Sequence, residues 1–467
     1  MREAGPHQKM GGTLSVERRK LRAWALLLTF VCSWLSACNG NVEETTSEWT
    51  APSVTPHPTQ TPTPTVYVDP DLLVELDVEE VEDEEDGTLT VYTWTNTFTN
   101  LLNEYTDVDF EVELIDINTY STRLDQALAS GEDAPDLFVC EGNIASRYIH
   151  SDNTLPLNDL GISYDEMGEM YEYSLQFAAD DDNIIKAMTW ELCPGAVIYN
   201  RDVAEDVLGV SEPEDVAPYF ESWDAFGETA TLVYDESEGD VRVVSGYDDL
   251  WRAYSGGRTS SWVVNSNLNV DPVWTDFFDL ALGLYEGDLT FDTTQLDSDW
   301  LANMNNDKVL SYWGPLWLVN MIKIQDPYGH WGVVMPPEEF SWGENWMMAS
   351  TSCDMKASVA QIMRDLALDE DNLIDMAGDG KFVNNMSVMA DIIDSEDYQM
   401  SYLNDQNPYG IFNDVAMEID ATDVTRYEQS FNDEFLNIVA LYVEGEFASK
   451  DDAEAEFETI VTELGLV

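Results

Sequence analysis

The chain has 467 residues, of which 20 are Lys or Arg and 92 are Asp or Glu, giving a formal net charge of −72 at pH 7. So few basic residues cannot displace counterions from a phosphate backbone, which excludes nucleic acid as a partner and disfavours phosphorylated ligands. The hydrophobic content of 44% supports buried cores, and the length is sufficient for two folded domains.

The N-terminus has the pattern of a secretory signal peptide over residues 1–37. A basic patch at residues 18–22 precedes an apolar run at residues 23–34, about 12 residues against the ~20 of a membrane-spanning helix. The run ends in Leu-Ser-Ala-Cys, which resembles the bacterial lipoprotein signal. The resemblance implies an acyl (palmitate) lipid on Cys38, so we expect the mature chain on the extracellular face of the cell membrane, held only by its lipid anchor. An ordinary secreted protein with a fortuitous cysteine is the alternative.

Residues 38–86 are predicted to form a disordered tether. Residues 55–65 are rich in threonine and proline, which bury little apolar surface and stiffen the chain into a spacer. Residues 79–86 are almost entirely acidic and are expected to be a solvated extension of it. The composition changes abruptly at residue 87, where we place the start of the folded body.

The folded body begins with alternating strand and helix patterns. Strands are predicted at residues 88–94, 110–117 and 134–140, with helices at 98–105 and 120–129 between them. This order predicts a parallel sheet covered by helices, with ligands bound beyond the carboxyl ends of its strands. Those ends have the sequences Trp94-Thr95-Asn96 and Glu141-Gly142-Asn143.

The rest of the chain repeats these patterns less regularly. Further strands are predicted at residues 184–191, 196–200 and 309–313, and a capped helix is predicted to start at Ser222. The last part is helical, with one apolar stripe formed by Phe431, Phe435, Ile438, Val439 and Tyr442.

No motif for catalysis or for a cofactor is present. The sequence has no His-Glu-x-x-His, no Gly-x-Ser-x-Gly and no phosphate-binding glycine loop, and its Asp-rich stretch 365–375 lacks the pattern of a calcium-binding EF-hand. Cys140, Cys193 and Cys353 of the mature chain leave one disulfide or three free thiols as alternatives. We therefore expect no catalytic residue, no metal and no cofactor.

Several motifs occur in the order of a known family. Trp190-Glu191 and Pro194-Gly195 are followed by Tyr199-Asn-Arg-Asp202. The other matching stretches are residues 128–137, 222–224, 300–304, 312–317, 331–336 and 342–346. Together they resemble the extracellular solute-binding proteins of carbohydrate ABC importers, the maltose-binding-protein-like family 1, over essentially all of residues 87–467.

This resemblance implies an α/β fold of the periplasmic-binding-protein type, with two lobes, hinge strands and an interlobe ligand cleft. The first lobe is expected to comprise residues 87–188 and about 332–378, and the second about 189–331 and 379–467. The resemblance also implies a monomer that binds a carbohydrate without catalysis and presents it to the transmembrane subunits of an ABC permease.

A site for neutral sugars needs flat aromatic side chains for their C–H faces, and carboxylate and amide partners for their hydroxyl groups. The candidates are tryptophans in strand ends or loops, or in stretches that match the family, together with nearby Glu and Asn residues. The predicted ligand-binding residues are Trp94, Asn96, Glu141, Trp190, Glu191, Trp262, Trp313, Trp317, Trp342, Asn345 and Trp346. Much of the family has tryptophan directly after Gly-Pro, where this chain has Leu316, so the sequence leaves open whether Trp313 or Trp317 reaches the cleft.

Two other classes of protein could have a similar composition. A secreted glycoside hydrolase also combines tryptophans with carboxylates, of which it needs one pair about 5–9 Å apart. A surface carbohydrate-binding protein or adhesin is the other alternative, although such chains usually contain repeats and none is found. The order of the motifs favours the binding protein of an importer over both.

Overall fold

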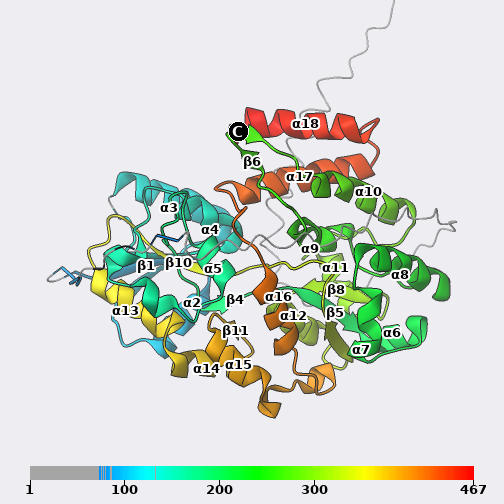
Figure 1. Cartoon of the computed structure of the whole chain (residues 1–467), viewed down its shortest axis with the longest axis horizontal. Coiled ribbons are helices and arrows are strands. Elements are labelled where there is room, and N and C mark those ends of the chain that lie inside the picture. Colours follow the sequence, from blue (N-terminus) through cyan, green and yellow to red (C-terminus); the bar gives the residue numbers. More distant parts are fainter. Residues whose placement is uncertain (1–72, 75, 77, 79, 85–86, 132) are drawn as a thin grey trace, which may run out of the picture.

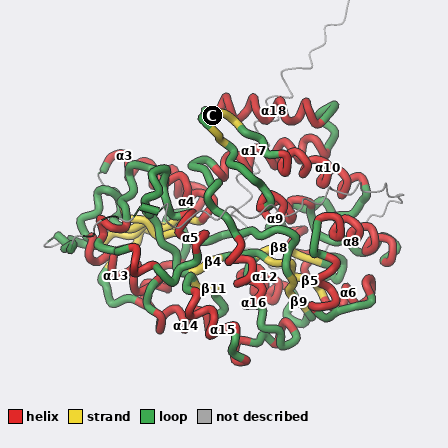
Figure 2. Tube along the Cα trace, in the orientation of Figure 1, coloured by secondary structure: helices red, strands yellow, loops and turns green. Residues whose placement is uncertain are grey.

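The computed structural model describes residues 73–467 except 75, 77, 79, 85–86 and 132. The predicted signal peptide and Cys38 lie outside these described residues. The described chain forms two lobes, each built around its own sheet, with short segments crossing between them (Figure 1). Figure 2 shows the two groups of strands well separated and surrounded by helices. The two-lobe α/β architecture is therefore as predicted.

The sheet of the first lobe has the strand order β10-β3-β1-β2. Its parallel strands are β1 (Leu89–Thr93), β2 (Phe110–Leu114) and β3 (Leu137–Glu141), and β10 (Asn345–Ala349) joins β3 antiparallel. The crossover helices α2 (Asn96–Tyr105) and α3 (Ile117–Ser130) confirm the predicted strand and helix order. The further helices of this lobe are α4 (Gly142–Ile149), α5 (Glu172–Phe177), α13 (Lys356–Ala367) and α14 (Glu370–Gly378).

The sheet of the second lobe is antiparallel, with β5 (Ala196–Asn200) between β8 (Ser311–Gly314) and β9 (Trp331–Val334). Its helices are α6 (Arg201–Leu208), α7 (Pro213–Val216), α8 (Trp223–Glu236), α9 (Trp251–Gly256), α10 (Pro272–Glu286), α11 (Ser298–Ala302) and α12 (Leu316–Gln325). A small hairpin is formed by β6 (Val263–Val264) and β7 (Asn267–Leu268). The C-terminal helices α17 (Glu428–Val443) and α18 (Lys450–Glu463) pack against each other, and α17 packs on α10.

Three segments cross between the lobes. The short strand β4 (Glu191–Leu192) pairs antiparallel with β11 (Phe382–Val383), and residues 335–344 connect β9 to β10. The predicted strand 184–191 is mostly an extended crossing segment, with isolated bridges at Ile185 and Met188 instead of a ladder. Met188 pairs with Met347 of β10, so this part of the segment runs beside the first sheet.

These contacts refine the expected lobe boundaries. Because β9 pairs with β5 in the second sheet, the chain returns to the first lobe within residues 335–344 and not at about residue 332. The helices α15 (Met386–Ile393) and α16 (Tyr409–Glu418), expected in the second lobe, contribute buried residues to a hydrophobic core shared by the first sheet and one face of the second sheet. The helix α16 lies at the junction, since it contacts both α5 and β5, and α15 packs on α16 and on β11.

The end of the predicted tether is docked on the first lobe. The Asp83 carboxylate accepts hydrogen bonds from the backbone N–H (3.0 Å) and the hydroxyl (2.6 Å) of Ser358 in the first turn of α13. The Val74 N–H donates to the carbonyl of Asn183 at 3.0 Å. The prediction of disorder is thus wrong for Val74 and Asp83, and the free N–H groups of a helix start attract the carboxylate of Asp83.

Within the described ranges, no helix combines the length and the apolar character needed to cross a membrane, and no group of His, Cys, Asp and Glu is arranged to hold a metal ion. Cys140, Cys193 and Cys353 are buried free thiols. Of the two alternatives left open by the sequence, the structure therefore has the three thiols.

Candidate functional site

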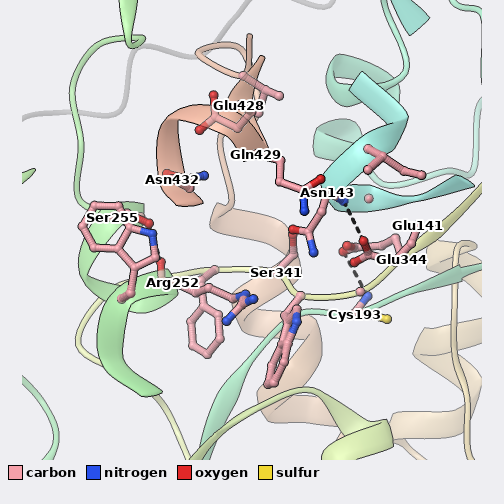
Figure 3. Close-up of a pocket in the computed structure, with 18 of the residues that line it drawn as sticks. Glu141, Asn143, Cys193, Arg252, Ser255, Ser341, Glu344, Glu428, Gln429 and Asn432 are labelled. Atoms are coloured by element: carbon pink, nitrogen blue, oxygen red, sulfur yellow. Dashed lines mark hydrogen bonds between the residues drawn. The ribbon is translucent and has the colours of Figure 1, made fainter. Parts of the chain in front are cut away.

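A cleft of about 2880 Å³ lies where the two lobes and the crossing segments meet. This exceeds the roughly 300–1000 Å³ of a typical small-molecule pocket, so it has room for a ligand larger than most small molecules. The ends of β1 and β3 open into it, as predicted for a parallel sheet. Figure 3 shows Asn143 from α4 and Gln429 from α17 extending into this space. The predicted residues that line the cleft are Trp94, Asn96, Glu141, Glu191, Trp317, Trp342 and Asn345.

The other four predicted tryptophans do not line the cleft. Trp190, Trp262, Trp313 and Trp346 are each at most 2% exposed. Trp262 is deep in the second core, where its ring lies 3.4 Å from that of Trp274 and its Nε1–H donates to Asn432. The predicted assignment of Trp262 to the site is wrong, because its ring is stacked between Trp274 and Phe431 in the core.

Trp346 and Trp313 instead support aromatic side chains that do line the cleft. Trp346 stacks on Phe177 with ring centroids 4.6 Å apart, and Trp313 stacks on Trp223 at 5.6 Å. Trp346 and Trp313 lie within strands whose two faces are covered, so their large rings fill the core, whereas Phe177 and Trp223 lie on helices at the edge. Trp223 follows the recognised helix start at Ser222 and could have been chosen on that signal, but nothing in the sequence marks Phe177.

Trp317 reaches the cleft and Trp313 does not, which answers the question left open by the sequence. The Nε1–H of Trp317 donates to the carbonyl oxygen of Trp342 at 2.9 Å, and the two rings meet edge to face at 4.6 Å. The Arg252 guanidinium lies 4.1 Å from the centre of the Trp342 ring. Trp342 is only 5% exposed, so Trp317 offers more free aromatic surface than Trp342 does.

Arg252 was not predicted, because a single arginine in a helix carries no signal of its position. Its Nη1–H donates to the Oε1 of the buried Gln295 at 2.6 Å. Burial lowers the pKa of Arg252 to about 10, an effect opposed by the nearby carboxylates of Glu141 and Asp248. The guanidinium remains charged at neutral pH and brings hydrogen-bond donors into an otherwise acidic cleft.

Buried carboxyl groups surround the crossing segments. Glu141 is the N-cap of α4 and accepts the Asn143 N–H at 3.1 Å, while Oε1 of Glu344 accepts from the Tyr173 hydroxyl and from the Cys193 N–H, both at 3.2 Å. Figure 3 shows Glu141 and Glu344 extending toward the same part of the cleft. Sequence reasoning missed Glu344, although it lies within the Trp342–Trp346 motif.

Burial changes the acidity of these groups. It raises the pKa of Glu141 to about 7, and the charge of Arg252 and the Asn143 N–H offset part of that effect. It raises the pKa of Glu191 to about 6, partly offset by Lys381, and also raises the pKa of Glu344. A hydroxyl-bearing ligand would find strong acceptors here, held in place by backbone N–H groups.

The comparisons with known proteins decide the family. The family model of bacterial extracellular solute-binding proteins matches residues 96–404. The chain belongs to this family. The solute-binding fold is shared by many solved structures, whereas no curated protein matches the sequence.

Three solved structures illustrate this likeness. An extracellular solute-binding protein of family 1 superposes with a TM-score of 0.70 and 18% identity, covering 80% of this chain and 99% of that one. The ABC transporter-associated binding protein of B. animalis subsp. lactis in complex with beta-1,6-galactobiose gives 0.63 and 15%, with 81% and 97% covered. The sugar-binding protein MalE of Xanthomonas citri gives 0.63 and 13%, also with 81% and 97% covered. At these identities the likeness establishes the fold, and the predicted two-lobe class is confirmed.

Replacing Glu141 by glutamine should stabilise this solute-binding protein at pH 8 but not near pH 4.5. The folded protein, with the pKa of Glu141 at about 7, binds more protons than the unfolded chain, whose ordinary value is 4.5. Stability therefore falls as the pH rises through that window, and glutamine removes the cost while its oxygen still accepts the Asn143 N–H.

Thermal unfolding of wild type and Glu141→Gln between pH 4.5 and 8 measures this effect. Asp116→Asn, at the exposed N-cap of α3, is the matched control and should show no such gain. A Glu141→Gln variant that unfolds at a lower temperature than wild type at pH 8 would contradict the burial argument.

Proposed function

We propose that this solute-binding protein captures a neutral mono- or oligosaccharide outside the cell and delivers it to the transmembrane subunits of an ABC permease. The observation that carries the proposal is that aromatic side chains of both lobes and buried hydrogen-bond acceptors line one cleft. Trp94 and Phe177 come from the first lobe, and Trp223 and Trp317 from the second. Such faces suit the C–H surface of a sugar, and the carboxyl groups suit its hydroxyl groups.

Closure of the two lobes would signal to the permease that a ligand is bound. A ligand that contacts both lobes binds the closed arrangement more tightly than the open one and therefore shifts the population toward it. The crossing segments are the natural hinge, because they are short and extended, with a two-residue pairing of β4 with β11 and a few backbone bonds between them. The permease would then recognise the closed form.

The proposed function does not include catalysis: the protein binds the sugar and releases it unchanged. The family consists of extracellular solute-binding proteins, and two of the similar structures are of proteins named for sugar binding or solved with a sugar. A glycoside hydrolase remains the competing function, because the cleft holds several carboxyl groups. Release of reducing ends from an oligosaccharide by the purified protein would favour the hydrolase.

Alanine at Phe177 or Trp223 should weaken sugar binding tenfold to a hundredfold, about 1–3 kcal/mol, because each removes an aromatic face from one lobe. Calorimetry against a panel of neutral mono- and oligosaccharides measures the change. Tyr328→Ala is the control, since Tyr328 is 91% exposed and lies outside the cleft. Full affinity in both cleft variants would mean that the site is elsewhere.

We also propose that the mature protein is a monomer anchored to the membrane by a lipid on Cys38. The sequence Leu-Ser-Ala-Cys at the end of the signal peptide supports the anchor. Cys38→Ala should move the protein from the membrane fraction to the soluble fraction after expression in a bacterial host, as measured by fractionation and immunoblotting. Cys353→Ala, at a buried thiol of the folded body, should leave the distribution unchanged. Continued membrane association of Cys38→Ala would exclude the lipid anchor.

A further inference from the structure

Gly142 and Glu344, which line the cleft, form a small notch together with the adjacent buried Trp346. Gly142 opens α4 directly after β3, and Glu344 directly precedes the neighbouring strand β10. Glu344 and Trp346 are two residues apart along an extended segment, so their side chains share a face. The Gly142 N–H donates to the Glu344 carbonyl at 2.7 Å, which holds the two segments together.

The missing side chain of Gly142 leaves a space with polar walls. A Cβ placed on Gly142 would lie 3.5 Å from Oε2 of Glu344 and 3.8 Å from Nε1 of Trp346. Oε1 of Glu344 accepts from Tyr173 and from Cys193, and Oε2 lies beside Gly142. The Ser341 side chain also hydrogen-bonds to this carboxyl group. Gly142 and Glu344 both line the cleft, so a ligand lying in it can place a small group in this space.

Trp346 provides an independent sign that something binds there. The residue is 2% exposed, and its Nε1–H has no hydrogen-bond partner among the described residues. Buried polar groups are nearly always paired, and an unpaired one indicates a missing water or ligand atom. The indole is buried and stacked on Phe177, which holds the plane of its ring.

We propose that this notch is a subsite for one hydroxyl group of the ligand, which accepts from Trp346 and donates to Glu344. An indole N–H only donates and an ionised carboxylate only accepts, so a group placed between Trp346 and ionised Glu344 must do both. An ammonium group would satisfy Glu344 alone, and a carboxylate would satisfy Trp346 alone. The inference rests on the proposed sugar-binding function and deepens it, because it assigns one ligand hydroxyl as a determinant of specificity.

The substitution Gly142→Ala tests the notch without disturbing the fold. The added methyl group makes only ordinary contacts of 3.5–3.8 Å with its protein neighbours, and alanine is favoured over glycine in a helix. It nevertheless fills the space that the hydroxyl needs. Gly410→Ala is the matched control, because Gly410 also lies in the first turn of a helix, has one ordinary contact with Ile393 at 3.7 Å and does not line the cleft.

The experiment uses calorimetry with maltose, cellobiose, lactose and β-1,6-galactobiose, followed by monodeoxy analogues of the tightest binder. We expect Gly142→Ala to lower the affinity at least tenfold with an unchanged melting temperature, and Gly410→Ala to have no effect. One monodeoxy analogue should bind wild type about tenfold more weakly than its parent and should lose no further affinity in Gly142→Ala. Trp346→Phe, which keeps the stacking ring, should also weaken the parent sugar but not this analogue.

The outcomes separate this inference from the function on which it rests. Sugar binding that is unchanged in both Gly142→Ala and Trp346→Phe would overturn the subsite and leave the proposed function intact, with the notch holding water only. Equal losses for the parent sugar and every deoxy analogue in Gly142→Ala would also overturn it, since no single hydroxyl would then be recognised. Failure of wild type to bind any of the four sugars would count against both proposals.

Discussion

The close approach of the segment 335–344 to both lobes is the constraint on which the rest of the structure depends. The carbonyl of Phe340 accepts from the Gly195 N–H at 2.7 Å, the Trp342 N–H donates to the Cys193 carbonyl at 2.9 Å, and Glu344 is bonded to Gly142. Gly195 must be glycine here because a Cβ would overlap the Phe340 ring. These bonds place Trp342 and Glu344 at the floor of the cleft and connect the lobes through a few backbone contacts.

How far the sequence could predict the site depends on what determines the position of each side chain. Trp94 and Glu141 follow the carboxyl ends of parallel strands, and topology alone places such residues at a cleft. Trp313 and Trp346 lie inside strands, where alternation predicts that a side chain changes face but not which face meets the cleft. Their neighbours Trp223 and Phe177 come from distant helices, so only the tertiary packing shows that they cover these rings. Arg252 and Glu344 depend in the same way on how the lobes are joined.

The exposed and the buried carboxyl groups of the chain have different physical effects. Most of its carboxylates are exposed and solvated, where they affect solubility and the long-range field more than any one contact. Glu141, Glu191 and Glu344 are different, because burial raises the pKa of each and makes the charged form costly. Such groups are commonly found at functional sites, and here they occupy the crossing region between the lobes. Neutral hydroxyl donors can hydrogen-bond to them without adding a further charge.

The central claim is that the cleft closes on a neutral saccharide. Small-angle X-ray scattering from the Cys38→Ala protein, recorded with and without a saturating sugar identified by calorimetry, tests it most directly. The account predicts that the radius of gyration falls when the sugar binds, and that the intact sugar is recovered afterwards. A bound sugar that leaves the radius of gyration unchanged, or that is recovered as cleaved products, would contradict it.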